Sequence, residues 1–113
     1  MKYMLLICGD PTVELTPDER AVMGPDTDAW VTEMDGRGVR LQGERLRPVR
    51  DATTVRVRAD QMLVVDGPFA ETKEQIAGFD ILDCADLDEA IEVAGKHPMA
   101  RHGAIEVRPF WPL

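Results

Sequence analysis

The chain has few of the residues from which metal and nucleophilic sites are usually built. Its 113 residues include two cysteines and two histidines, and aromatic residues make up 5% of it. No C-x-x-C pair occurs and the two histidines are not spaced as metal ligands, so we expect no metal site. The G-x-G-x-x-G, Walker, G-x-S-x-G and H-E-x-x-H patterns are also missing. This argues against nucleotide-binding, serine-hydrolase and zinc-protease classes, and we expect no cofactor.

Long hydrophobic runs are missing too. No apolar run approaches the roughly 20 residues that span a bilayer. The apolar block at 4–8 is too short for a signal-peptide core, and no cleavage pattern follows it. We therefore expect a cytoplasmic protein without a membrane partner. Cys8 and Cys84 lie inside apolar runs, which favours buried free thiols in a reducing compartment over one disulfide.

Positive charge is scarce overall but concentrated in one segment. Thirteen Lys and Arg residues face 21 Asp and Glu, and the net charge of −8 argues against general nucleic-acid binding. Seven arginines nevertheless fall within residues 37–58, against two acidic residues. This segment is either an anion-binding ribbon, in which Arg45 is a candidate ligand-binding residue, or the solvated face of two strands. The alternation of arginine and valine along 55–58 favours the solvated face.

The length and the apolar pattern indicate one domain, residues 1–113, with alternating strands and helices. A capping box from Thr16 to Glu19 begins the first helix, which we expect Gly24-Pro25 to break or kink. A second capping box from Asp86 begins the last helix, whose apolar stripe is expected to be Leu87, Ala90, Ile91 and Ala94. The expected strands are 3–8 (buried on both faces), 39–46 (with a bulge near 43–44), 53–58, 61–65, 77–84 and 104–108.

This order is β-α-β, a β-hairpin insert, and β-α-β. Two helical regions most naturally cover one face of an antiparallel sheet, which predicts an α+β ferredoxin-like sandwich. The other face would stay open and partly apolar, so we expect a homodimer in which a second copy covers it. Phe110-Trp111 is the expected interface anchor at the C-terminal tail.

The stretch from Asp66 to Phe79 carries the main candidate for chemistry. Gly67 and Pro68, followed by Phe69, form a rigid structural loop, because glycine takes positive φ and proline fixes its own φ. If the loop lines a cleft, the Asp66 carboxylate is a candidate general base. Alternatively, Asp66 accepts hydrogen bonds from its own turn. Glu71 is a candidate ligand-binding residue.

The two histidines near the C-terminus are the other titratable candidates. His97 follows the last helix, where the helix dipole favours a cation. His102 leads into the last strand, from which it can reach a pocket, and is a second catalytic candidate. Arg101 beside it is a candidate contact for an anionic ligand.

Several ordered blocks resemble one known family. Asp66-Gly67-Pro68-Phe69 with the run that follows, 86–90, 103–109 and the strand at 4–7 together look like the DGPF branch of the YCII-related proteins. The resemblance covers nearly the whole chain. It implies a dimeric ferredoxin-like α/β barrel, related in architecture to cofactor-independent monooxygenases and muconolactone isomerases. Many members lie near sigma-factor genes in bacterial genomes, and most are uncharacterised.

Some YCII-related proteins carry a proposed catalytic His-Asp pair, with the histidine on the first helix. This chain has no histidine before His97, so the pair is not present in that form. Two functions follow as hypotheses. The first is a homodimer that binds a small polar or anionic molecule, as a cofactor-independent acid–base enzyme using Asp66. The alternative is a non-catalytic ligand-sensing or protein-interaction module linked to sigma-factor regulation.

Overall fold

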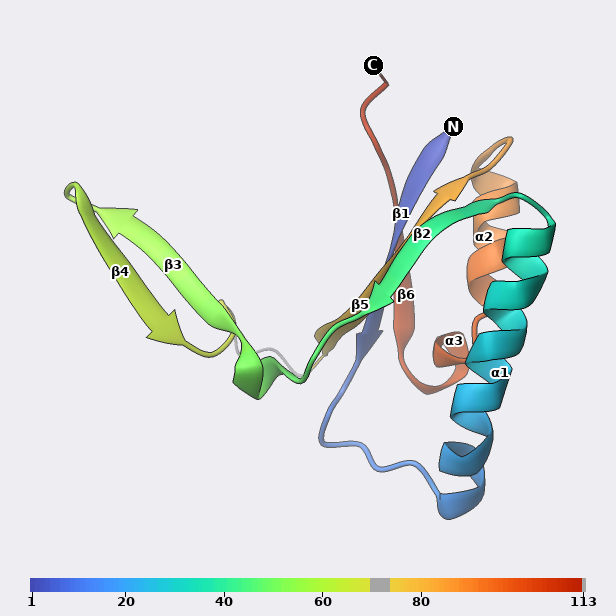
Figure 1. Ribbon diagram of the computed structural model, residues 1–113, viewed down its shortest axis with the longest axis horizontal. Coiled ribbons are helices and arrows are strands. Elements are labelled where there is room, and N and C mark those ends of the chain that lie inside the picture. The colour runs from blue at the N-terminus through green and yellow to red at the C-terminus, as the bar shows by residue number, and fades with distance from the viewer. Residues whose placement is uncertain (70–73, 113) are drawn as a thin grey trace.

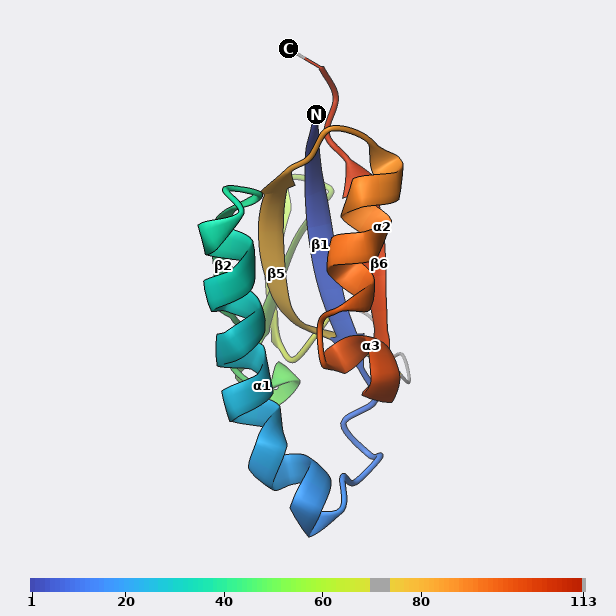
Figure 2. The same ribbon diagram turned by 90° about the vertical axis from the view of Figure 1, so that its right-hand side faces the viewer.

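A computed structural model describes residues 1–69 and 74–112 (Figure 1). Four strands form an antiparallel sheet in the order β2-β5-β1-β6, and β3 and β4 form a separate hairpin. The elements in chain order are β1 (Lys2–Gly9), α1 (Pro17–Gly36), β2 (Arg40–Arg45), η1 (Val49–Asp51), β3 (Thr53–Arg58), β4 (Gln61–Asp66), β5 (Gln75–Asp83), α2 (Leu87–Gly95), α3 (Met99–His102) and β6 (Ala104–Pro109). The helices lie on one face of the sheet (Figure 2). The predicted α+β ferredoxin-like fold is confirmed.

The side chains of the central strand β1 alternate between the two faces of the sheet, and those on the helical side form the middle of the core. Tyr3, Leu5 and Ile7 are buried on the helical side, while Met4 and Leu6 point to the opposite face and are half-buried. The expectation that this strand is buried on both faces is therefore wrong for one face. The sheet's second face is covered by no helix among the described residues.

The first helix begins as the sequence predicts. The Thr16 hydroxyl accepts from the Glu19 amide (3.1 Å), and the Glu19 carboxylate accepts from the Thr16 amide (2.8 Å). This reciprocal pair satisfies two amide groups that the first turn leaves without partners. The helix start is confirmed.

The expected break at Gly24-Pro25 is wrong, because α1 runs without interruption through Pro25. A proline ring normally collides with the Cβ of the residue before it, and Gly24 has no Cβ. The Thr27 hydroxyl donates to the Met23 carbonyl oxygen (2.7 Å) one turn away, which adds a bond beside the one to Ala21 that Pro25 cannot make. Trp30 and Met34 then pack the second half of the same helix into the core.

Two other local predictions need adjustment. The irregularity in β2 lies between Arg40 and Gln42, not near Gly43. In α2 the Asp86 cap is confirmed, since its carboxylate accepts from the Glu89 amide (2.9 Å). The predicted apolar stripe is only half right: Ala90 and Ala94 are buried together with Val93, whereas Leu87 and Ile91 are exposed. The buried face of α2 is thus the one that carries Ala90, Val93 and Ala94.

The hairpin is confirmed, with its turn at Ala59-Asp60, where both residues have positive φ (50° and 62°). Two consecutive left-handed residues give the turn whose twist matches that of paired strands. The hairpin extends on the side of the sheet opposite the helices (Figures 1 and 2). Both cysteines are free thiols, as expected, and burial raises the pKa of Cys84 to about 11.

Gly103 lies where the chain passes close to the backbone of β1. A Cβ built there would lie against the backbone carbonyl oxygen of Cys8, inside normal contact distance. Gly103→Ala is therefore expected to lower the free energy of unfolding by about 1–3 kcal/mol or more, because backbone must separate from backbone. Gly95→Ala is the control, since a Cβ at Gly95 meets nothing within 4 Å. Urea unfolding of both variants measures the difference, and equal stabilities would contradict this packing.

Candidate functional site

The two buried polar side chains of the described residues line the same cavity. Asp80 is 6% exposed and His97 is 5% exposed. The cavity has a volume of about 780 Å³ and lies between α1 and the β2–β5 side of the sheet. Its apolar wall includes Ile7, Leu15, Met23, Trp30, Val31 and Met99, and its charged rim includes Arg20, Asp28 and Arg45. Buried ionisable groups converging on one cavity are typical of a functional site.

Asp80 is held in place by Arg40. The Arg40 Nε donates to the carboxylate at 2.8 Å, and another guanidinium nitrogen donates to the Gly43 carbonyl oxygen at 3.2 Å. Arg40 also reaches Asp35 at 3.3 Å. Burial raises the pKa of Asp80, and the bond from Arg40 offsets part of that rise.

Gly43 is the residue that admits this pair. A Cβ at Gly43 would overlap the Asp80 carboxylate and crowd the Arg40 guanidinium. The β2 strand therefore needs glycine opposite Asp80, for space and not for backbone freedom. Arg45 lies on the rim of the same cavity, and its role in binding a ligand stays a prediction.

His97 is neutral in this environment, which corrects the expectation of a cation at the end of the helix. Burial lowers the pKa of His97 to about 4. Its Nδ1 accepts from the Met99 amide (3.0 Å), so this nitrogen carries no proton and Nε2 does. The Nε2–H makes no hydrogen bond within the described residues. His97 lines the cavity, so this donor group is a candidate contact for a molecule bound there.

Trp30 positions His97 from the first helix. The two rings meet edge to face, with centroids 4.7 Å apart and an interplanar angle of 66°. The indole Nε1 donates to the Val93 carbonyl oxygen (2.9 Å), which fixes the ring against α2. The imidazole is thus packed between α1 and the segment after α2.

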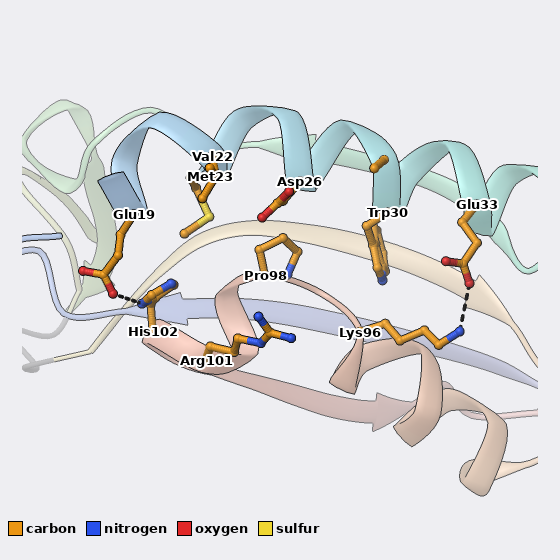
Figure 3. A pocket seen from close by; sticks show the side chains of 11 residues that line it. Glu19, Val22, Met23, Asp26, Trp30, Glu33, Lys96, Pro98, Arg101 and His102 are labelled. Carbon is orange, nitrogen blue, oxygen red and sulfur yellow. Dashed lines mark hydrogen bonds and ion pairs between the residues drawn. The ribbon is translucent and has the colours of Figure 1, made fainter. Parts of the chain in front are cut away.

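A second cavity of about 560 Å³ lies between α1 and the α2–α3 segment (Figure 3). It contains the predicted pair Arg101 and His102, and it shares Met23 and Trp30 with the larger cavity. His102 lies 3.6 Å from the Glu19 carboxylate, which is already used in the helix cap. Lys96 is paired with Glu33 at 3.0 Å. The cationic groups of this cavity are therefore largely engaged by α1.

Asp66 lies elsewhere. It is the last residue of β4, it is exposed, and neither cavity includes it. Gly67 has a φ of 105°, as the turn requires. The Gly67 amide donates to the Ala52 carbonyl oxygen (2.7 Å), and the Thr54 hydroxyl donates to the Gly67 carbonyl oxygen (2.8 Å). The loop is thus rigid where it is described, through groups other than the Asp66 carboxylate.

Of the remaining candidate residues in this loop, the structure describes Pro68 and Phe69. Pro68 is half-buried, and Phe69 is exposed with the Arg56 guanidinium 4.8 Å above its ring. Such a contact is a cation–π interaction. Glu71 lies outside the described residues.

The sequence analysis missed Asp80, Arg40 and the role of His97. The sequence could have indicated Asp80, because Asp80 lies two residues before Leu82 and so shares the buried side of β5 with it. A carboxylate at a buried strand position needs a hydrogen-bonding or charged partner. Arg40 lies 40 residues away in sequence, so only the sheet register brings it to Asp80. His97 had no local signal.

Two further searches of the described residues give negative findings. No helix there is both long and apolar enough to cross a membrane. No group of three or more potential ligands (His, Cys, Asp or Glu) there could hold a metal ion.

Comparison with known proteins identifies the family. The model of the YCII-related domain matches residues 1–113. The chain belongs to the YCII-related family. It is also 51% identical, over 101 aligned residues, to an uncharacterised protein of Rhizobium meliloti (strain 1021), covering 74% of this chain and 82% of that relative.

The neutral state of His97 gives this YCII-related domain a pH dependence. Its pKa lies below the ordinary 6.5, so on acidification the unfolded chain binds the proton first. Stability is therefore expected to fall between about pH 6.5 and pH 4, with a slope from this group of up to about 1.4 kcal/mol per pH unit.

Urea unfolding of the wild type and His97→Gln at pH 7.0, 6.0 and 5.0 isolates this contribution, because the carboxylates titrate in both proteins. The difference in stability is expected to shrink as the pH falls. His102→Gln is the matched control and should leave the dependence in place. A wild type and a His97→Gln variant with parallel pH profiles would contradict a neutral buried His97.

Proposed function

We propose that this YCII-related domain binds a small organic molecule in the larger cavity and carries out cofactor-independent acid–base chemistry on it. The observation that supports this most is that Asp80 and His97, the buried polar side chains of the described residues, line the same cavity. The cavity's volume of about 780 Å³ is in the range of small-molecule sites, roughly 300–1,000 Å³.

The wall defines the class of ligand. Trp30, Met23 and Met99 offer an apolar surface for the body of the molecule. Arg20 and Arg45 lie at the rim on opposite walls, α1 and β2, and neither has an ion-pair partner among the described residues. A compact molecule with an apolar body and a carboxylate or carbonyl oxygen fits these groups. The rim acid Asp28 disfavours a purely anionic ligand.

The two buried groups suit different halves of a proton transfer. The Asp80 carboxylate, with a pKa raised by burial, is a candidate general base. The neutral imidazole of His97 donates from Nε2 and is suited to stabilise negative charge that develops on a ligand oxygen. Asp80 therefore replaces Asp66 as our candidate catalytic carboxylate. The reaction class is proton transfer next to a carbonyl group.

A homodimer is part of this proposal. On the sheet face away from the helices, Met4 pairs with Ile81 and Leu6 pairs with Phe79, and all four side chains are half-buried. A central apolar strip between charged neighbours is the form of a sheet face that a second copy covers.

Ligand sensing without turnover is the second candidate function. It is favoured by the Arg40 bonds to Asp80, which hold the carboxylate in an ion pair and lower its basicity. The two functions use the same cavity and differ in the effect of Asp80→Asn on binding and on turnover of the ligand. A sensor keeps binding without any product, whereas an enzyme loses turnover.

A thermal-shift screen of carboxylic and keto acids tests the proposal. A ligand present at 100 times its Kd stabilises the folded state by about 2.7 kcal/mol, which corresponds to a Tm increase on the order of 10 °C. His97→Gln is expected to remove most of that increase, because it removes the donor to the ligand oxygen, whereas Asp80→Asn is expected to keep binding and to abolish turnover. Asp88→Asn, an exposed position in α2, is the matched control and should keep it.

Asp66→Asn separates the two carboxylates. We expect it to bind and turn over the hits as the wild type does, measured by thermal shift and by proton exchange of the hit in D₂O. Loss of both signals in Asp66→Asn, with both retained in Asp80→Asn, would overturn the assignment of the site to the larger cavity.

A further inference from the structure

The β3–β4 hairpin carries an apolar face that is open to solvent. In its register Val55 pairs with Val64 and Val57 pairs with Met62, so these four side chains share one face. Their exposed fractions are 57%, 59%, 57% and 70%. The two pairs form a continuous apolar surface without a polar residue between them. We call this face the arm face.

The hairpin stands away from the rest of the chain. The radius of gyration is 16.1 Å, whereas a compact domain of this length has about 13 Å. Figure 1 shows the hairpin and the sheet diverging from a common end near η1, with the helices on the far side of the sheet. A two-stranded hairpin alone is at best marginally stable in water. The arm face therefore needs a surface to pack against.

We propose that the hairpin is an arm that packs its arm face on a second copy of this chain, so that each copy clasps the other. The inference rests on the homodimer in the proposed function and adds the surface that holds it. The side of the sheet toward which the hairpin extends is the side with the uncovered strip of Met4, Leu6, Phe79 and Ile81. A partner sheet that covers this strip would also lie between the sheet and the arm of the first copy.

Charge favours a second copy as the occupant. Residues 45–66 hold five arginines against three aspartates, in a chain whose net charge is −8. The arm segment is thus basic and the remainder of the chain is strongly acidic. An arm that approaches a second copy therefore meets a chain whose remainder has the opposite net charge, which favours association of the two copies.

Sedimentation velocity of the full chain over a range of concentrations tests the proposal. The double variant Val57→Lys/Met62→Lys places two charges on the arm face, and we expect it to weaken dimerisation by about tenfold or more. Leu63→Lys is the matched control, because Leu63 is exposed on the opposite face of the same hairpin, across from Arg56. It should change the dimer Kd by less than about threefold. A ¹H–¹⁵N spectrum with unchanged β1 and β5 signals shows that the core is folded.

A mixture of ¹³C-labelled and unlabelled chains locates the contact. Isotope-filtered NOEs from the Val55, Val57, Met62 and Val64 methyl groups to the unlabelled copy support the arm. If the wild-type dimer lacks these NOEs, or if the double variant dimerises as the wild type does, the arm contact is contradicted. The dimer would then form through the sheet face alone. A monomeric wild type overturns both, and anionic vesicles that capture such a monomer identify a lipid surface as the occupant instead. Loss of ligand binding in the larger cavity has no bearing on any of these outcomes.

Discussion

The hydrogen bond from the Trp30 indole to the Val93 carbonyl oxygen is the contact on which the helical layer depends. It joins α1 to α2, two helices that the chain connects only through the sheet. The same indole contacts His97 and lines both cavities. Because that packing excludes water from the imidazole, the Trp30 ring also maintains the neutral state of His97. Fold and site chemistry are thus linked through one side chain.

The sequence predicted the architecture because its signals are local. Thr16 with Glu19, the Asp86 cap and the Ala59-Asp60 turn each act within a few residues, and each is confirmed. The break at Pro25 was wrong because the absence of a Cβ on the preceding glycine and the packing of Trp30 outweigh the general penalty of proline. A penalty of that kind is decided by tertiary contacts that a local pattern does not contain.

The site was harder to predict than the fold for the same reason. Asp66 stood out because a rigid turn surrounds it, yet rigidity marks a loop and not a cavity. Asp80 sits in an ordinary strand, and its importance comes from Arg40 on the neighbouring strand and from the space above Gly43. Arg101 and His102 line a pocket, but α1 supplies carboxylates beside that pocket, and their role as ligand-binding and catalytic residues stays a prediction. Which polar side chain becomes buried therefore depends on how the strands pair and pack, and a local sequence pattern does not contain that information.

The central claim is that the cavity beside Asp80 and His97 is the binding site, and the methionines report on it directly. Met99 and Met23 line that cavity, whereas Met62 lies on the exposed hairpin and Met34 in the core. A ¹³C-methyl methionine spectrum, recorded with each hit from an organic-acid screen, separates these places in one measurement. Shifts at Met99 and Met23, with Met62 unchanged, are the predicted result. Hits that bind tightly but shift only Met62, or no methionine near Asp80 and His97, would contradict the assignment.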